Sequence, residues 1–156
     1  MKADCESLFR SGNDFELVDR LFCSAADKKE REGAASLNEV QRTLLLAWHA
    51  HGVIGNGSLK SFFEADLPVE PTAAALEQIG MARAAKLLRL APDLFPGEKP
   101  DSDFQKRLAQ MEEIEAKRPS ALNELSTAFW EASDGFDSAM AEFVRANEAA
   151  FRELVN

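Results

Sequence analysis

The chain has 156 residues, of which 46% are hydrophobic and 29% are charged. This length allows a buried core, and this composition excludes a disordered or fibrous protein. Acidic residues outnumber Lys and Arg by 27 to 18, which gives a formal net charge of −9. Such a charge disfavours direct binding to nucleic acid, whose phosphates would repel it, but it permits binding to a basic protein.

The apolar residues are mainly Ala, Leu and Phe, and Tyr is absent. This selection favours helices, because sheets draw on Val, Ile, Thr and Tyr. We therefore predict an all-α fold without a sheet, in a single compact domain of eight or nine helices over residues 1–156. Aromatic and Met residues that recur at helical spacing are interpreted as core.

Neither the cysteines nor the apolar segments indicate an exported or membrane protein. Cys5 and Cys23 lie in no CxxC pair and cannot form a framework of several disulfides. Cys23 falls on an apolar stripe, which predicts a buried free thiol. The first residues lead into no apolar signal segment, and no stretch approaches the roughly 18 apolar residues of a membrane span. We expect a soluble, cytoplasmic protein.

The first clear helix is predicted to begin at Asp14 and to end in the charged segment 27–32, before Gly33. The mixed charges of that segment are interpreted as a solvated last turn. One face of this helix carries apolar residues at helical spacing, which are expected to point into the core. These residues are Phe15, Val18, Leu21, Phe22 and Ala25.

Two overlapping capping patterns, Ser36-x-x-Glu39 and Asn38-x-x-Gln41, predict the start of the next helix. We expect that helix to end at Gly52. The segment 55–58 then forms a tight turn, because Gly55, Asn56 and Gly57 tolerate positive φ. Ser58 is predicted to cap a short helix that carries Phe62 and Phe63 inward.

The rest of the chain is predicted as helices separated by proline and glycine. Residues 67–71 form a linker, and Thr72 caps a helix to Ile79. A further helix from Ala82 contains Leu87, Leu88 and Leu90, with Pro92 near its end, and a helix from Asp103 to Pro119 has Phe104, Leu108, Met111 and Ile114 inward. Ser120 caps a helix that ends at the turn Asp134-Gly135, and a last continuous helix covers 136–154.

No catalytic or metal-binding pattern stands out. His49 and His51 lie about 200° apart on a helix and cannot share a metal. No G-x-S-x-G motif, complete dinucleotide loop or P-loop is present. We therefore predict no metal, no cofactor and no enzymatic activity. An alternative is a small-molecule-binding or enzymatic site at the turn 55–63, with His49, His51 and Asn56 as its polar groups.

The charge distribution is uneven. Residues 119–144 contain no Lys or Arg, and residues 119–156 carry seven acidic side chains against two arginines. This segment should therefore project a negative potential. The candidate partner-binding residues, selected on this charge distribution, are the five carboxylates inside the cation-free window: Glu124, Glu131, Asp134, Asp137 and Glu142.

Helical spacing lets such carboxylates approximate the phosphates of DNA. Residues seven apart on a helix are separated by about 10.5 Å along its axis. Duplex DNA carries a phosphate about every 3.4 Å of axis per strand. Helical carboxylates can therefore stand near every second or third phosphate. The alternative is an acidic face that only keeps the protein soluble.

Several short motifs, in this order and spacing, resemble the bacterial DNA-mimic protein family, whose shared domain was first catalogued as one of unknown function. The resemblance covers about residues 36–154, so that residues 1–35 would form an N-terminal helical extension. The motifs are Leu37-Asn38 with Arg42, Gly55-Asn56-Gly57-Ser58-Leu59-x-Ser61-Phe62-Phe63, Ala75-Leu76-x-x-Ile79-Gly80 with Ala84-Ala85, Phe95-Pro96, Phe129-Trp130 and Phe143-Val144-x-x-Asn147.

The resemblance implies an all-helical fold and a dimeric acidic protein that occupies the DNA-binding surface of a transcription regulator. The shared motifs themselves, among them Asn38 and the 55–63 turn, are interpreted as structural. This sequence departs from the family pattern in three places. Ser58 stands where a second glycine is usual, Leu59 replaces Phe, and Ser61 replaces Gln.

Three functions follow as hypotheses. The first is a DNA-mimic inhibitor or regulator that binds a basic protein, with an immunity-type inhibitor of a toxin nuclease as a close alternative. Its binding should weaken with salt and compete with DNA. The second is the small-molecule or enzymatic domain at the 55–63 turn. The third is an interaction domain whose acidity serves solubility alone.

Overall fold

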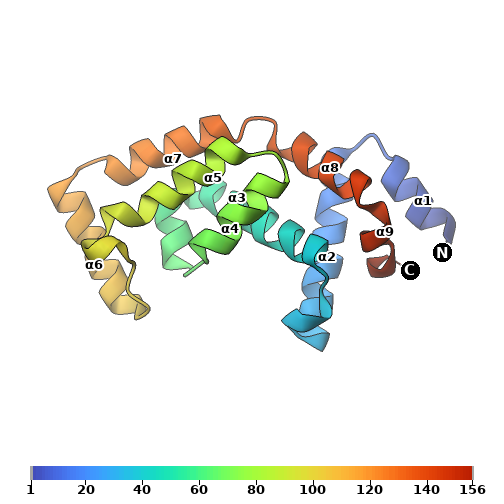
Figure 1. Ribbon diagram of the computed structural model, residues 1–156, viewed down its shortest axis with the longest axis horizontal. Coiled ribbons are helices and arrows are strands. Elements are labelled where there is room, and N and C mark those ends of the chain that lie inside the picture. Colours follow the sequence, from blue (N-terminus) through green and yellow to red (C-terminus); the bar gives the residue numbers. More distant parts are fainter. Residues whose placement is uncertain (1, 156) are drawn as a thin grey trace. The chain divides into compact units, whose positions relative to one another are not determined.

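The computed structural model describes residues 2–155, with side chains from residue 6 onward (Figure 1). Every regular element among these residues is helical, which confirms the all-α prediction. Short 3-10 turns lie at Ala34–Ser36, Ala91–Leu94, Pro96–Glu98 and Arg152–Leu154. The α-helices are α1 (Lys2–Arg10), α2 (Asp14–Glu32), α3 (Glu39–Glu64), α4 (Val69–Gln78), α5 (Ala82–Leu90), α6 (Phe104–Lys117), α7 (Ala121–Ala132), α8 (Phe136–Ala146) and α9 (Glu148–Phe151).

The contacts group the chain into two compact units. The first comprises Met1–Trp48 and Gly135–Asn156, and in it α8 packs against α2. The second comprises His49–Asp134, where α4 packs on α5 and α5 on α7, so these helices lie side by side in Figure 1. The division into an extension over 1–35 and a domain over 36–154 stays a prediction.

In the first unit, α3 begins with a reciprocal capping box. The side-chain oxygen of Asn38 accepts from the Gln41 amide at 2.9 Å, and Gln41 Oε1 accepts from the Asn38 amide at 3.2 Å. This confirms one of the two predicted capping patterns. Ser36 instead donates its hydroxyl to the carbonyl of Gly33 at 2.7 Å, inside the preceding 3-10 turn.

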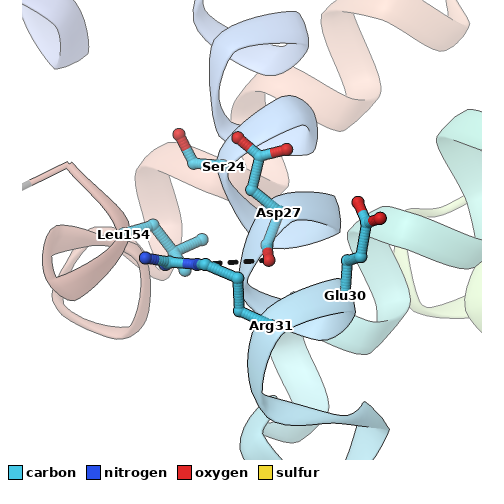
Figure 2. A pocket seen from close by; sticks show the side chains of 5 residues that line it. All are labelled: Ser24, Asp27, Glu30, Arg31 and Leu154. Carbon is cyan, nitrogen blue, oxygen red and sulfur yellow. Dashed lines mark hydrogen bonds between the residues drawn. The ribbon is translucent and has the colours of Figure 1, made fainter.

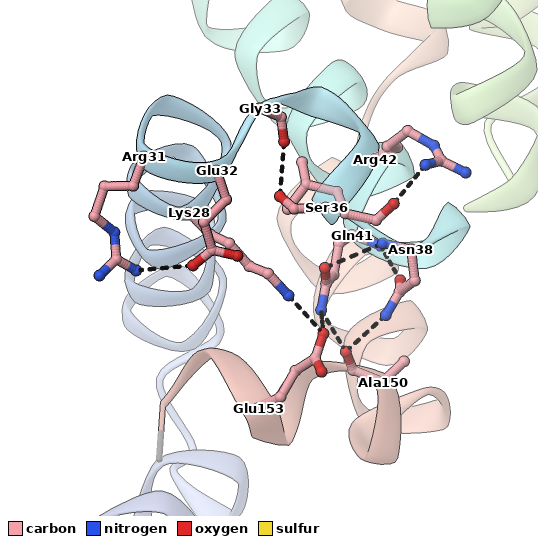
Figure 3. Close-up of polar contacts among 11 residues, drawn as sticks. Lys28, Arg31, Glu32, Gly33, Ser36, Asn38, Gln41, Arg42, Ala150 and Glu153 are labelled. Atoms are coloured by element: carbon pink, nitrogen blue, oxygen red, sulfur yellow. Dashed lines mark hydrogen bonds and ion pairs between the residues drawn. The ribbon is translucent and has the colours of Figure 1, made fainter.

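The same two residues hold the C-terminal turn of the chain (Figure 3). Asn38 Nδ2 and Gln41 Nε2 both donate to the carbonyl of Ala150, at 3.1 and 2.8 Å. Gln41 also donates to Glu153 Oε1 at 2.7 Å, and Lys28 Nζ donates to the same oxygen at 3.0 Å. Because Gln41 is fully buried, these bonds satisfy a polar group that would otherwise be costly.

Protonation of Glu153 is expected to lower the free energy of unfolding at acid pH. The Gln41 hydrogen bond, and then the hydrogen bond and charge of Lys28, lower the pKa of Glu153 below its usual value. A lowered folded-state pKa stabilises the fold above the unfolded pKa, and this stability is lost as pH falls through the folded pKa. In urea unfolding, Glu153→Gln should therefore be less stable than the native protein at neutral pH, and the difference should shrink below about pH 4.

A matched control is Glu142→Gln, which removes one charge from an exposed residue that forms no ion pair with a described residue. If Glu153→Gln lost as much stability at about pH 3 as at about pH 7, ionisation of Glu153 would not be the cause.

α3 does not end at Gly52, as the sequence predicted, because Gly52 continues the helix on its exposed side. The break falls later, at Gly57 (φ −151°) and Ser58 (φ 69°, ψ −178°). The positive φ thus falls on a serine, not on a glycine. Beyond it, the Leu59 amide donates to Ser126 Oγ at 3.0 Å and the Lys60 amide to Ser58 Oγ at 3.3 Å. Ser58 therefore bonds the first turn of the short helix, as predicted.

Replacing Ser58 by glycine is expected to stabilise the protein. The backbone region that Ser58 occupies is essentially restricted to glycine, and it costs other residues about 1–3 kcal/mol. Against this, glycine loses more chain entropy, about 0.5–1 kcal/mol, and it cannot accept from Lys60. We expect a net gain of about 1 kcal/mol in the free energy of unfolding, measured by chemical denaturation.

Ser58→Ala is the control, since it keeps the strained conformation and removes the capping bond. It should destabilise the protein. Equal effects of the two substitutions would show that backbone strain at residue 58 does not limit stability.

Two aromatic residues predicted on the apolar faces of their helices are exposed instead. Phe15 and Phe104 have 57% and 48% of their surface accessible. Phe15 and Phe104 stand in the first turn of their helices, and the deeper positions are taken by Leu17 and Arg107. The apolar faces of α2 and α6 therefore extend, at the start of each helix, beyond the buried core.

The prediction of a buried Cys23 is also wrong, because its thiol is exposed. Cys23 lies two residues after the buried Leu21, which places it about 200° around the helix and on the outer face. The side chain of Cys5 lies outside the described residues.

Two predicted helix boundaries and one predicted capping bond differ from the structure. Thr72 does not cap a helix, because α4 begins at Val69 with Pro71 in its first turn, where a missing amide costs little. Ser120 stands at the start of α7, as predicted, but it is left-handed and its side chain forms no capping bond. The last helix breaks at Asn147, whose side-chain amide donates to the Phe143 carbonyl at 2.8 Å. The predicted breaks at Gly80 and Gly135 are confirmed, and both glycines adopt positive φ.

Over the described residues, no helix has both the length and the apolar character that a bilayer span requires.

Candidate functional site

The five candidate carboxylates are all exposed, and they lie on two consecutive helices. Glu124 and Glu131 belong to α7, Asp134 follows its end, and Asp137 and Glu142 belong to α8. The first three fall in the unit His49–Asp134 and the last two in the other unit. They therefore form two groups, which we describe separately.

The α7 group is aligned. Glu124 and Glu131 are seven residues apart, so their side chains leave the helix within about 20° of each other and about 10.5 Å apart along the axis. Asp134 continues the chain past the helix end, where its amide donates to the Glu131 carbonyl at 3.4 Å. The spacing matches that of every third phosphate in a DNA strand.

The α8 group is not aligned. Asp137 and Glu142 are five residues apart, which places them about 140° apart around the helix. These two residues therefore do not form a row of carboxylates along α8. Asp137 lies in the first turn of α8, where the partial positive charge of the helix end favours an anion.

None of the five carboxylates forms an ion pair with a described residue. The two arginines of the C-terminal segment are bound elsewhere. Arg145 pairs with Asp14 at 2.8 Å and donates to the Ser11 carbonyl at 2.9 Å, and Arg152 pairs with Glu148 at 2.5 Å. These two arginines therefore do not neutralise the five carboxylates.

Acidic residues outside this set show the contrast. Glu70 on α4 and Glu77 on the same helix both accept hydrogen bonds from Arg89 on α5, at 2.7 Å for Glu70. These bonds lower the pKa of both carboxyl groups. A carboxylate held in this way presents little free charge to a partner. The acidic surface of α4 is thus partly neutralised within the fold.

The turn over residues 55–63 contributes to the packing of the core. Phe62 and Phe63 are buried with their rings 5.4 Å apart in an edge-on arrangement. A Cβ on Gly57 would stand 2.9 Å from Ser61 Cβ, so a larger residue here would force a shift of the backbone. Asn56 is exposed. Its neighbour Gly55 approaches Trp130, and an added Cβ would lie 3.0 Å from the indole ring.

The two histidines differ in their exposure to solvent. His49 is exposed, whereas His51 is half-buried and stacks on Trp130 with ring centroids 4.9 Å apart. Ser133 Oγ lies 3.4 Å from His51 Nε2. No group of three or more His, Cys, Asp or Glu among the described residues is arranged to hold a metal ion.

A hollow of about 340 Å³ lies along α2, lined by Ser24, Asp27, Glu30, Arg31 and Leu154. Figure 2 shows the carboxylates of Asp27 and Glu30 directed away from the guanidinium of Arg31, whose Nε donates to the Asp27 carbonyl at 3.4 Å. None of the lining residues belongs to the segment 49–63. This hollow therefore gives no support to the hypothesis of a small-molecule site at the 55–63 turn.

The sequence of the chain matches the family described as DMP19-like protein over residues 35–147, which is most of its length. The chain belongs to this family. DMP19 denotes DNA mimic protein 19, so the match confirms the resemblance to DNA-mimic proteins. No curated protein and no solved structure matches the chain.

The DMP19-like segment contains α3 to α8 and with them all five candidate carboxylates. The two remaining acidic residues of the C-terminal region, Glu148 and Glu153, fall outside it and are paired within the fold. The DMP19-like segment also includes Trp130, whose exposed ring was missed at the sequence level because its motif was interpreted as core.

Proposed function

We propose that this DMP19-like protein is a non-catalytic DNA mimic that binds the basic surface of a DNA-binding protein, a transcription regulator or a nuclease. The observation that carries the proposal is the set of five exposed carboxylates without an ion pair to any described residue. Family membership supports the same function. Binding would prevent the partner from engaging DNA.

The physical basis is substitution of carboxylates for phosphates. Lys and Arg side chains on a DNA-binding surface are spaced to meet phosphates, and charge-assisted hydrogen bonds form equally well with carboxylate oxygens. Glu124 and Glu131 stand about 10.5 Å apart on one side of α7. The proposal includes a homodimer, as the resemblance implies, because two copies would present two acidic rows to a two-fold symmetric regulator.

Affinity purification from the native host at low salt tests the function. We expect retention of a DNA-binding protein that is released by duplex DNA and by raised salt, since both compete for the same cations. A retained nuclease would assign an immunity-type role, and a retained transcription factor a regulatory one. A partner that stays bound in excess DNA and in high salt would contradict the proposal.

A further inference from the structure

Trp130 is exposed in a position where its sequence neighbour is fully buried. It leaves 53% of its surface accessible, whereas Phe129 is completely covered. Trp130 stands near the C-terminal end of α7, within the unit His49–Asp134. Tryptophan is one of the residues that dominate binding energy at protein interfaces, so its exposure marks a candidate contact point.

The indole of Trp130 is held in place from one side. The His51 ring stacks on it at 4.9 Å with an interplanar angle of 19°. The backbone of Gly55 also lies against it, because an added Cβ would come within 3.0 and 3.1 Å of two ring atoms. One face is thus packed against α3, and the exposed surface belongs to the rest of the ring. The ring is a fixed platform, so binding to it would cost little side-chain entropy.

Two carboxylates lie close to this platform in the sequence. Glu131 is the next residue on α7, about 100° further around the helix, and Asp134 lies in the turn beyond the end of α7, four residues after Trp130. Both are exposed, and neither forms an ion pair with a described residue. An aromatic face beside free carboxylates matches a guanidinium, which is planar and weakly hydrated. A guanidinium can stack on a ring while it donates in its own plane. A lysine ammonium has no such plane.

We propose that Trp130, Glu131 and Asp134 form an arginine-binding site for a basic partner protein. The guanidinium stacks on the open part of the indole and donates to the two carboxylates. This inference rests on the proposed function and deepens it, because it assigns arginine, and not lysine, as the residue that anchors the partner.

The test uses tryptophan emission of the full chain. The only tryptophans are Trp48 and Trp130, and the chain lacks Tyr, so Trp48→Phe leaves Trp130 as the one indole. An oligoarginine and an oligolysine peptide of equal length serve as probes at low salt. We expect the oligoarginine to bind more tightly and to change the emission of Trp130, whereas the oligolysine leaves it nearly unchanged. Native protein compared with Trp130→Phe gives the same reading should Trp48→Phe fail to fold.

Trp130→Leu should weaken oligoarginine binding by roughly three- to tenfold and leave oligolysine binding within about twofold. Phe15→Leu is the matched control, since Phe15 is also an exposed aromatic residue, and it should change neither affinity.

Three results would overturn the inference. Equal binding of both peptides with unchanged emission would remove the arginine site and leave the acidic-surface function standing. Absence of binding by either peptide would defeat both. Conversion of a dimer to a monomer by Trp130→Leu in sedimentation experiments would assign Trp130 to a contact between copies of the chain.

Discussion

Conversion of Glu124, Glu131, Asp134, Asp137 and Glu142 to their amides is expected to weaken binding of the captured DNA-binding protein by about 100-fold at low salt. Each carboxylate is exposed and forms no ion pair with a described residue, so its charge is available to the partner. The measurement is a titration of the purified partner at several salt concentrations. The difference should vanish near 1 M salt, where charges are screened within about 3 Å.

A matched variant separates a local site from general attraction. It converts five other exposed carboxylates, each without an ion pair to a described residue, and takes the net charge from −9 to −4 just as the first variant does. We expect its affinity to stay within about threefold of native, because these charges lie outside the proposed site. Equal losses in the two variants would contradict a localised site. The five residues are Asp27, Glu30, Asp93, Glu98 and Glu112.

Arg107→Met is expected to lower the free energy of unfolding by about 3 kcal/mol. Arg107 is 3% exposed, and its guanidinium donates to the Phe63 carbonyl at 2.6 Å and to the Asp101 and Ser102 carbonyls at 2.7 and 3.2 Å. Asp66 lies 3.6 Å from it but is largely exposed and adds little. Methionine fills similar volume but leaves these carbonyls without their donor. Urea unfolding measures the loss.

Two further substitutions define the cause. Arg118→Met removes an exposed arginine just after α6 and should change stability by less than about 0.5 kcal/mol. Arg107→Lys keeps the charge but cannot reach all three carbonyls, so it should recover only part of the loss. Near-native stability of Arg107→Met would show that solvent or other donors replace the guanidinium.

The elements that were predicted correctly depend on residues close together in sequence. The Asn38–Gln41 capping box and the glycines at positions 80 and 135 act within a few residues, so a local pattern suffices to place them. Arg107 could not be predicted to be buried, because its main partner is the carbonyl of Phe63, 44 residues earlier. The apolar stripe of α6 suggested Phe104 for the inward position instead.

The sequence identified candidate residues for the site but not their arrangement in space. The window without Lys or Arg identified five carboxylates, and all five are exposed. Their arrangement depends on helix phase, which aligns Glu124 with Glu131 and separates Asp137 from Glu142. The exposed ring of Trp130 could not be predicted, because its packing depends on Gly55, which is far away in sequence.

The joint at Ser58 couples two helices of the second unit. The amide of Leu59 donates outside α3, to Ser126 Oγ on α7, and both residues are buried. Detachment of α7 would therefore remove the acceptor of an amide that begins the second part of α3. These two segments should open together as one cooperative piece of local unfolding, even though almost seventy residues separate them along the chain.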